Sequence, residues 1–363
     1  MISIDKAKDE RFKVNIKVFG LGGGGCNAID NMVDSELLEG IDFIAVNTDQ
    51  QVLDKSIAPY KAAIGKRLTK GLGAGGDPEV GEEAAKEDRD TLKELMEGTT
   101  LLFITTGMGG GTGTGSAHVV ASIAKELDIL TIGVVTKPFE FEGEKRREYA
   151  EKGIEKLRDI ADATIIIPNQ RLYEIEDGKV AFHNAFKMVD DILLDSIRGL
   201  AELLDTTGVI NVDFMDLRKV MQIDGETFIG IGKGEGENKA VEAAQQAIET
   251  PLVEDLNMNG AKEILMNVIA GEDFDLTEMD RVVRVVSDKT GGYGNLKYGV
   301  VIDPEISDRV KVTVVAKGFE KAKKSKKELF GEDEKIRDVR TLSTIEPEDD
   351  DFNTPAIFRR KVD

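Results

Sequence analysis

The first half of the chain alternates short apolar runs with stretches of helical periodicity. The apolar runs are rich in β-branched residues and predict strands at Val14–Phe19, Ile41–Asn47, Leu101–Thr105, Leu130–Thr136 and Ile165–Pro168. Between them, Glu79–Met96 and Ser116–Leu127 repeat apolar residues at helical spacing, which predicts helices. Apolar strands separated by helices are typical of a parallel sheet covered on both faces, and ligands bind such sheets at the carboxyl ends of the strands.

The second half begins with one long amphipathic pattern. A single apolar stripe at spacings of three and four consists of Phe182, Phe186, Val189, Leu193, Ile197, Leu200 and Leu204. Further along, helical patterns at Ala240–Ile248 and Thr277–Ser287 alternate with strand patterns at Glu263–Ile269, Tyr298–Ile302 and Val310–Ala316. These patterns predict a long central helix followed by a second, smaller domain of helices and strands.

The last segment changes character. A basic run at Lys321–Lys327 precedes an acidic run at Glu346–Asp351, and the low apolar content without periodicity predicts a disordered linker. A small apolar island at Pro355, Ile357 and Phe358 then breaks the pattern. Such an island is either a chance cluster or a peptide that folds onto a partner.

We therefore predict an α/β fold with a parallel-sheet nucleotide-binding domain, a long central helix, a smaller α/β (α+β) C-terminal domain and a disordered tail. The predicted parts are an N-terminal extension at 1–13, the nucleotide domain at 14–181, the central helix at 182–206, the C-terminal domain at 207–318, the linker at 319–350 and a terminal peptide at 351–363.

Composition narrows the setting. The 363 residues carry 48 Lys and Arg against 69 Asp and Glu, a net charge of −21, which argues against non-specific binding to nucleic acid. One cysteine cannot form an internal disulfide and fits a reducing cytoplasm. The first residues lack the apolar core of a signal peptide, and runs such as Ile129–Val135 fall short of the roughly 20 residues that span a bilayer. We expect a cytoplasmic protein with no transmembrane segment and no nucleic-acid partner.

The first glycine loop, Gly20–Ala28, directly follows a predicted strand and opens a helix. Gly20, Gly22 and Gly25 satisfy GxGxxG, and Asp49 ends the next strand, as in a Rossmann dinucleotide site. Glycines let the backbone approach a pyrophosphate, and the helix N-terminus offers free N–H groups. Alone, the pattern also fits a tight structural turn.

The second glycine loop, Gly107–Ser116, separates these possibilities. It lies between an apolar strand and a helix, and its six glycines and interleaved Thr112 and Thr114 predict a concave backbone that can surround several phosphate oxygens. Dinucleotide enzymes do not need two such loops, and no GxxxxGK[ST] motif is present. Since neither loop carries a lysine, we expect backbone dipoles and Mg²⁺ to meet the phosphate charge. A third cluster, Lys70–Ala85, either closes over the terminal phosphate or is an ordinary loop and helix cap.

Seven ordered stretches resemble the FtsZ family of tubulin-like cell-division GTPases. The resemblance extends from about Val14 to Gly318. The stretches are GGGGCNAI, NTDQQVL, LTKGLGAGGDPEVG, GMGGGTGTGSA, VVTKPFEFEG, IPNQRL and NVDFMDLRKVM. The resemblance implies a GTP-binding domain at 14–181, a C-terminal GTPase-activating domain at 207–318, and GTP or GDP with Mg²⁺ as ligands.

The same resemblance implies roles for individual residues. The α- and β-phosphate side would be lined by Gly23, Gly24, Gly25, Cys26 and Asn27, and the third cluster would contribute Gly75 and Gly76 at the terminal phosphate. The β- and γ-phosphates would be cradled by Gly110, Gly111, Thr112, Gly113 and Thr114, the ribose approached by Glu142 and Arg146, and the base held by Asn169, Phe186 and Asp190.

The base trio also has a physical rationale. Phe186 and Asp190 are four positions apart and share a helix face, so a ring can stack on a purine while a carboxylate accepts guanine N1–H and N2–H. Adenine offers no such donor pair. Without the family, the pattern favours Phe186 as a core residue on the apolar stripe.

Asp213 and Asp216 lie three apart at a helix start, after Asn211. By themselves they fit an N-cap with favourable dipole interactions. The resemblance instead implies that this loop reaches the γ-phosphate of the next subunit, where Asn211, Asp213 and Asp216 would complete the catalytic site. Hydrolysis would then depend on head-to-tail assembly into filaments.

The resemblance implies a filament-forming GTPase of the cytokinetic ring, cytoplasmic and located at the division site. Its partners would be further copies of itself and, through Thr354–Lys361, membrane-tethering or regulatory division proteins; the basic residues there could alternatively touch acidic lipid. The alternatives are a tubulin-like GTPase of cell shape or DNA segregation, a non-hydrolysing GTP-binding scaffold and a Rossmann-type oxidoreductase. Two positions depart from the family pattern, Cys26 and His118, and we assign neither a chemical role.

Overall fold

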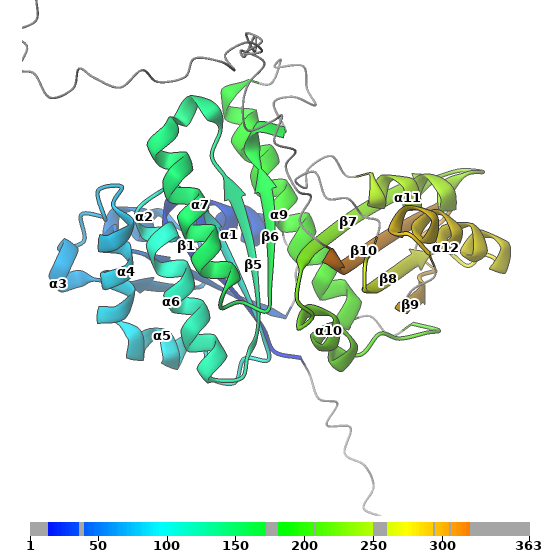
Figure 1. Cartoon of the computed structure of the whole chain (residues 1–363), viewed down its shortest axis with the longest axis horizontal. Helices are drawn as coiled ribbons and strands as arrows, with labels where there is room; N and C mark the ends of the chain where they lie inside the picture. The colour runs from blue at the N-terminus through cyan, green and yellow to red at the C-terminus, as the bar shows by residue number, and fades with distance from the viewer. Residues whose placement is uncertain are drawn as a thin grey trace, which may run out of the picture. The chain divides into compact units, whose positions relative to one another are not determined.

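Two sheets joined by one long helix make up the described part of the chain (Figure 1). The structure is a computed structural model that describes residues 14–35, 40–171, 181–205, 208–249, 260–292, 295–304 and 306–319. The predicted N-terminal extension, the terminal peptide and nearly all of the predicted linker lie outside these residues. The parallel sheet, the long helix and the smaller sheet domain confirm the predicted fold class, while the domain boundaries stay predictions.

The first sheet has six parallel strands in the order β3-β2-β1-β4-β5-β6. The strands are β1 (Ile16–Leu21), β2 (Ile41–Asn47), β3 (Tyr60–Ala63), β4 (Leu101–Gly107), β5 (Leu130–Lys137) and β6 (Ala163–Pro168). The chain order reverses between the neighbours β1 and β4, and a crevice forms at the carboxyl ends of the strands at such a switch point.

Helices cover both faces of this sheet. One face packs against α1 (Gly22–Asp34) and α9 (Phe182–Asp205), and the other against α4 (Pro78–Glu87), α5 (Arg89–Leu95), α6 (Thr112–Glu126) and α7 (Glu144–Arg158). Alternate residues of one strand enter different cores: Val18 packs on the α1 side and Phe19 on the α6 side. The short helices α2 (Gln50–Lys55), α3 (Lys66–Thr69) and η1 (Glu140–Glu142) complete this part.

The second sheet has four strands in the order β7-β10-β8-β9. Its elements are α10 (Phe214–Met221), β7 (Glu226–Glu235), α11 (Lys239–Ile248), β8 (Glu263–Ala270), α12 (Leu276–Thr290), β9 (Asn295–Ile302) and β10 (Arg309–Phe319). Strand β10 runs antiparallel to β7 and β8, while β8 and β9 are parallel. One face packs on α11 and α12, and the other packs toward α9 and α10.

Helix α9 is the element that both sheets share. Its buried residues Leu193, Ile197 and Leu200 belong to one continuous core with Val134 of the first sheet and Val315 of the second. The predicted apolar stripe therefore serves two sheets at once. No helix among the described residues is long and apolar enough to cross a membrane.

The structure corrects the sequence prediction in two places. The predicted helix Glu79–Met96 is two helices, because the chain turns at Asp88, whose carboxylate accepts a hydrogen bond from the Gly65 N–H at 2.7 Å. Strand β7 carried no clear apolar pattern because glycines occupy alternate positions on the face that meets α11.

These glycines let the β7 backbone lie directly against α11. A Cβ at Gly232 would sit 1.9 Å from the Ala243 carbonyl oxygen, and one at Gly230 would sit 1.7 Å from the Ala247 carbonyl oxygen. Both contacts are with backbone atoms, so a side chain there forces helix and strand apart.

We expect Gly232→Ala to lower the free energy of unfolding by about 1–3 kcal/mol through overpacking. Thermal or chemical unfolding followed by circular dichroism measures the change. Lys233→Ala is the matched control, because Lys233 is exposed on the same strand. Equal stability of the two variants would contradict the close packing of β7 on α11.

Candidate functional site

Both main glycine loops lie at the switch point of the first sheet. Helix α1 begins directly after β1, and the residues after β4 lead into α6 at Thr112, so two helix N-termini follow the carboxyl ends of neighbouring strands. A Cβ at Gly22 would lie 2.8 Å from the Gly113 nitrogen, and one at Gly24 would lie 3.2 Å from the Gly107 nitrogen. The glycines thus bring the two loops into backbone contact, which larger residues would prevent.

Other glycines in the loops face open space. A Cβ built at Gly23, Gly75, Gly76 or Gly110 meets no heavy atom within 4 Å. Gly75 and Gly76 also have positive φ angles of 60° and 77°, a backbone conformation that favours glycine. At these four positions there is open space beside the backbone, as expected for loops that surround a phosphate group.

The two predicted threonines shape the second loop. The Gly109 N–H donates to Thr114 Oγ1 at 2.8 Å, and Thr112 Oγ1 lies 2.6 Å from Thr48 Oγ1 at the end of β2. Because Thr114 accepts from the backbone, its own hydroxyl proton remains able to donate. Sequence reasoning had given both hydroxyls only a direct role toward phosphate.

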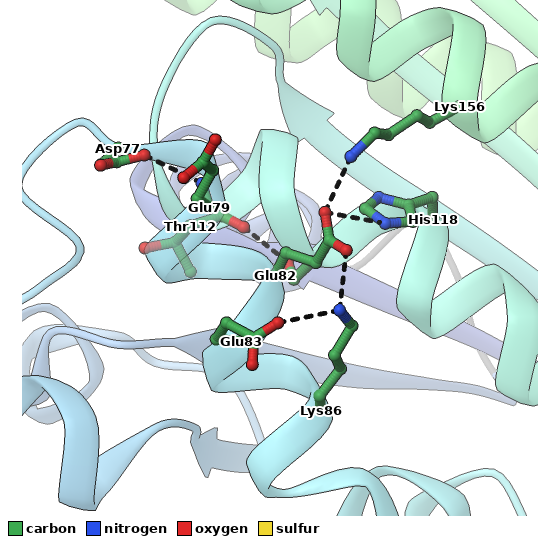
Figure 2. Close-up of polar contacts among 9 residues, drawn as sticks. Asp77, Glu79, Glu82, Glu83, Lys86, Thr112, His118 and Lys156 are labelled. Atoms are coloured by element: carbon green, nitrogen blue, oxygen red, sulfur yellow. Dashed lines mark hydrogen bonds and ion pairs between the residues drawn. The ribbon is translucent and has the colours of Figure 1, made fainter.

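The third loop is tied to the end of β2. The Gly73 N–H donates to the Thr48 carbonyl at 3.2 Å, and the Gln50 N–H donates to the Gly71 carbonyl at 3.0 Å. Asp49 caps α2 by accepting from the Gln51 N–H at 2.9 Å, a different use from the ribose contact of a Rossmann site. Asp77 caps α4 in the same way, accepting from the Glu79 N–H at 2.9 Å (Figure 2).

One carboxylate, Glu82, links the helices behind the loops. Figure 2 shows Glu82 of α4 facing Lys156 of α7, His118 of α6 and its own helix neighbour Lys86, at 2.8, 3.3 and 2.9 Å. Burial acts to raise the pKa of Glu82, but hydrogen bonds from Lys156 and Lys86 outweigh it and lower the pKa to about 2. Burial lowers the pKa of His118, although the nearby charge of Glu82 acts to raise it.

The three predicted base-binding residues belong to α9 and to the end of β6. Phe186 and Asp190 lie one turn apart on α9, and Asn169 directly follows β6. Asn169 is 4% exposed, and its Oδ1 has no hydrogen-bond partner among the described residues. A buried amide oxygen without a partner fits a ligand that brings an N–H donor. The Phe186 ring packs edge-on against Phe139, with ring centroids 5.4 Å apart.

The carboxyl group of Asp190 has a raised pKa. Burial and, second, the neighbouring Asp191 raise the pKa of Asp190 to about 7. Asp191 itself accepts a hydrogen bond from Asn31 Nδ2 of α1 at 3.1 Å, which ties α9 to the helix of the first glycine loop. Near neutral pH the Asp190 carboxyl is therefore poised between its neutral and ionised forms.

Glu142 and Arg146 form an ion pair with 2.7 Å between Nη1 and Oε2. The backbone of Arg146 also touches the second loop, since a Cβ at Gly109 would lie 2.6 Å from the Arg146 carbonyl oxygen. Among the residues of the first loop, Asn27 is exposed, whereas Cys26 is 1% exposed with its thiol among core atoms. Burial raises the pKa of Cys26 to about 12, which excludes thiolate chemistry at neutral pH.

The segment with Asn211, Asp213 and Asp216, which we call the aspartate loop, follows the other end of α9. Asn211 Oδ1 accepts from the Gly208 N–H at 2.6 Å, and Asp213 caps α10 by accepting from the Asp216 N–H at 2.7 Å. Phe186 and Asp190 lie near the beginning of α9, whereas Asn211 follows its end (Figure 1). The helix has 24 residues, which corresponds to about 36 Å. The structure therefore keeps the predicted catalytic residues away from the glycine loops of the same chain.

Sequence reasoning missed two charged partners at these sites. Lys297 of β9 forms an ion pair with Asp216, and Glu82 links three helices. Lys297 is 81 positions from Asp216, and no local pattern indicates such a pair.

Large apolar side chains are exposed in two regions, near the glycine loops and near the aspartate loop. Leu68, Leu72, Phe141 and Phe186 are exposed around the glycine loops and the base site, and Val209, Ile210, Met215 and Tyr298 are exposed around the aspartate loop. The remaining large exposed apolar residues of the described part are Ile57, Tyr60 and Leu276. Clustered exposed apolar residues mark surfaces that bind a partner.

The described residues contain no group of three or more acidic, His or Cys side chains that could hold a metal ion by themselves. Mg²⁺ in nucleotide sites is bound largely by phosphate oxygens and water, with one or two carboxylates.

Comparison with known proteins agrees with this geometry. The description "Tubulin/FtsZ family, GTPase domain" matches residues 15–177, and "FtsZ family, C-terminal domain" matches residues 225–320. A cell division protein FtsZ from Coxiella burnetii (strain RSA 493 / Nine Mile phase I) is 47% identical over 304 residues, covering 84% of this chain and 78% of that protein.

Solved structures give the same result. An empty FtsZ dimer from M. jannaschii superposes with a TM-score of 0.77 at 40% identity, over 86% of this chain and 92% of that one. A GTPγS-bound protofilament of CetZ2 from Haloferax volcanii shares the fold, with a TM-score of 0.73 at 20% identity over 85% of this chain and 94% of that one.

The doubly covered parallel sheet with two contacting glycine loops, joined by a long helix to a smaller sheet domain, defines a tubulin-like GTPase. The chain belongs to the FtsZ family, the cell-division members of that class. As a member it binds GTP and GDP and hydrolyses GTP. Membership of this family rules out the alternative of a Rossmann-type oxidoreductase.

We expect Glu82→Gln to lower the free energy of unfolding by about 1 kcal/mol at pH 7. The substitution removes the negative charge that pairs with Lys86, His118 and Lys156. The folded pKa of Glu82 is lowered from 4.5 to about 2, so this contribution is present above about pH 4.5 and is lost as the pH falls toward 2. Unfolding curves at several pH values measure it. Glu83→Gln is the control, because Glu83 is 62% exposed; the same loss in both variants would contradict the role of Glu82.

Proposed function

We propose that this GTPase polymerises head to tail and that each active site is completed by the aspartate loop of the next subunit. The observation that carries the proposal is the length of α9: the part of the helix from Asp190 to its end at Asp205 spans about 22 Å, and Asp213 lies beyond that end. A second copy stacked along the same direction brings its aspartate loop to the glycine loops. Head-to-tail contacts that do not close generate filaments.

Nucleotide selection follows from the base residues. The Asp190 carboxylate accepts guanine N1–H and N2–H, Phe186 stacks on the purine, and the free Oδ1 of Asn169 accepts a further N–H. Adenine lacks the N1–H and N2–H donors, so the site selects GTP over ATP. Glu142 and Arg146 lie beside the second loop and bind the ribose.

The phosphates are held by backbone. The backbone at Gly23, Gly75, Gly76 and Gly110, where there is open space for a ligand, binds oxygens of the triphosphate through its N–H groups, and the N-termini of α1 and α6 supply positive dipole. Thr112, Thr114, Gly24, Gly25, Gly111 and Gly113 maintain the shape of the cradle. Mg²⁺ bound to the phosphate oxygens would neutralise charge at the transferring group.

Hydrolysis requires an oriented water molecule. The exposed Asp213 and the partly exposed Asp216 of the incoming loop accept hydrogen bonds from this water and orient it toward the γ-phosphate, with Asn211 shaping the loop. Neither half of the site is complete alone, which explains why hydrolysis should follow assembly.

The exposed apolar residues support this stacking. Leu72 at the glycine-loop end and Met215 at the aspartate-loop end are 78% and 64% exposed in the single chain, and a head-to-tail contact buries both groups. The filaments form the cytokinetic ring at the division site in the cytoplasm. The predicted partner peptide Thr354–Lys361, which would bind membrane-tethering or regulatory division proteins, lies outside the described residues.

We expect phosphate release from GTP, per subunit, to show a lag at low protein concentration and then rise steeply, with ATP inactive. Asp213→Asn keeps a side chain that caps α10 but removes the carboxylate, so hydrolysis should fall by a factor on the order of 10². Asp275→Asn is the matched control, because Asp275 caps α12 by accepting from the Thr277 N–H at 2.7 Å. A specific rate independent of concentration, or an active Asp213→Asn variant, would refute the shared site.

We further expect GTP affinity to depend on pH through Asp190. Its pKa is raised to about 7 in the free protein, and guanine requires the ionised carboxylate, so affinity should fall about tenfold per unit below pH 7 and level off above it. Isothermal titration across pH 5.5–8.5 measures the effect. The Asp190→Asn variant should bind GTP more weakly at pH 8 and lose the part of the pH dependence that Asp190 causes. Any pH dependence of affinity that remains in the variant comes from the phosphates of GTP. An unchanged profile would rule Asp190 out as the group that titrates.

A further inference from the structure

The ion pair between Lys297 and Asp216 places a cation beside the aspartate loop. Lys297 Nζ donates to Asp216 Oδ1, and the two side chains are 37% and 28% exposed. Lys297 lies on β9, which is the edge strand of the second sheet, and Asp216 lies in the first turn of α10. The pair therefore connects the sheet edge to the helix that carries the candidate catalytic residues.

The surroundings keep this lysine charged. The hydrogen bond to Asp216 raises the pKa of Lys297, and the nearby charges of Glu263 and Asp213 act in the same direction despite partial desolvation. Arg218, a cation of the same helix, is paired elsewhere, with Asp128. Lys297 is thus the cation that the described structure joins to Asp216.

Head-to-tail assembly creates an electrostatic difficulty that this cation addresses. Two carboxylates approach a triphosphate, and like charges repel strongly where water is excluded. Neither main glycine loop contains a lysine, so the cradle itself offers no side-chain cation. A positive charge on the incoming loop reduces the repulsion and also restricts the rotation of the Asp216 carboxylate.

We propose that Lys297 is a positioning residue for hydrolysis in trans: it orients Asp216 and delivers a compensating positive charge to the nucleotide phosphates of the neighbouring subunit. This inference rests on the shared active site proposed above. It differs from a purely structural role, since a partly exposed ion pair on an edge strand contributes little to folding. Substitution should therefore leave the fold intact and change assembly and turnover.

The test measures GTP turnover per subunit of the full chain across protein concentrations, together with sedimentation of polymer. Lys297→Met should raise the concentration threshold several-fold and lower the plateau rate by roughly tenfold, while Lys297→Arg should retain most of both. Because repulsion between Asp216 and phosphate is screened by salt, the difference in threshold between Lys297→Met and the parent should narrow from 50 to 300 mM KCl. A structural defect would instead lower the melting temperature and persist at high salt.

Lys289→Met is the matched control. It removes the same charge from the second domain, but Lys289 pairs with Glu249, and both side chains are more than half exposed, at 57% and 58%. Lys297→Met behaving like Lys289→Met, while Asp216→Asn is inactive, would overturn the role of Lys297 and leave the shared site intact. A parent chain with a flat specific rate, or an active Asp216→Asn variant, would instead overturn the shared site itself.

Discussion

The apolar stripe of α9 is the constraint on which the rest of the structure depends. Leu193, Ile197 and Leu200 are buried in one core with both sheets, and each such side chain stabilises the fold by about 1.5–3 kcal/mol through burial. Because its apolar face from Val189 to Leu204 packs in this core, the helix behaves as a rod of fixed length. The base residues at its start and the aspartate loop after its end are held apart by that rod.

The glycine contacts impose a second constraint, within the nucleotide end. Gly22 meets Gly113 and Gly24 meets Gly107 through backbone atoms, so neither loop can move without the other. Glu82 adds a charged connection behind them, from α4 to α6 and α7. The two glycine loops and the helices behind them therefore pack as one unit, and in the proposed function the shape of this unit, rather than lysine charge, provides the affinity for phosphate.

Sequence patterns were sufficient wherever the signal was local. Five of the six strands of the first sheet, all but β3, were predicted from spacing along the chain, and the two glycine loops lie at the switch point of that sheet. The shared helix face of Phe186 and Asp190 also follows from spacing alone. Strand β7 was missed because alternate glycines erase its apolar pattern, and the helix break at Asp88 because its cause is a bond to distant Gly65. Lys297 and Asp216, far apart in sequence, could be joined only by the fold.

The position of Cys26 has a practical consequence. The chain contains one cysteine, and its thiol is buried, with a pKa raised to about 12. Maleimides and disulfide reagents react with an accessible thiolate, which this residue does not supply. A cysteine introduced at an exposed position is then the one reactive thiol of the molecule, so fluorophores or cross-linkers can be attached at a chosen site without first replacing Cys26.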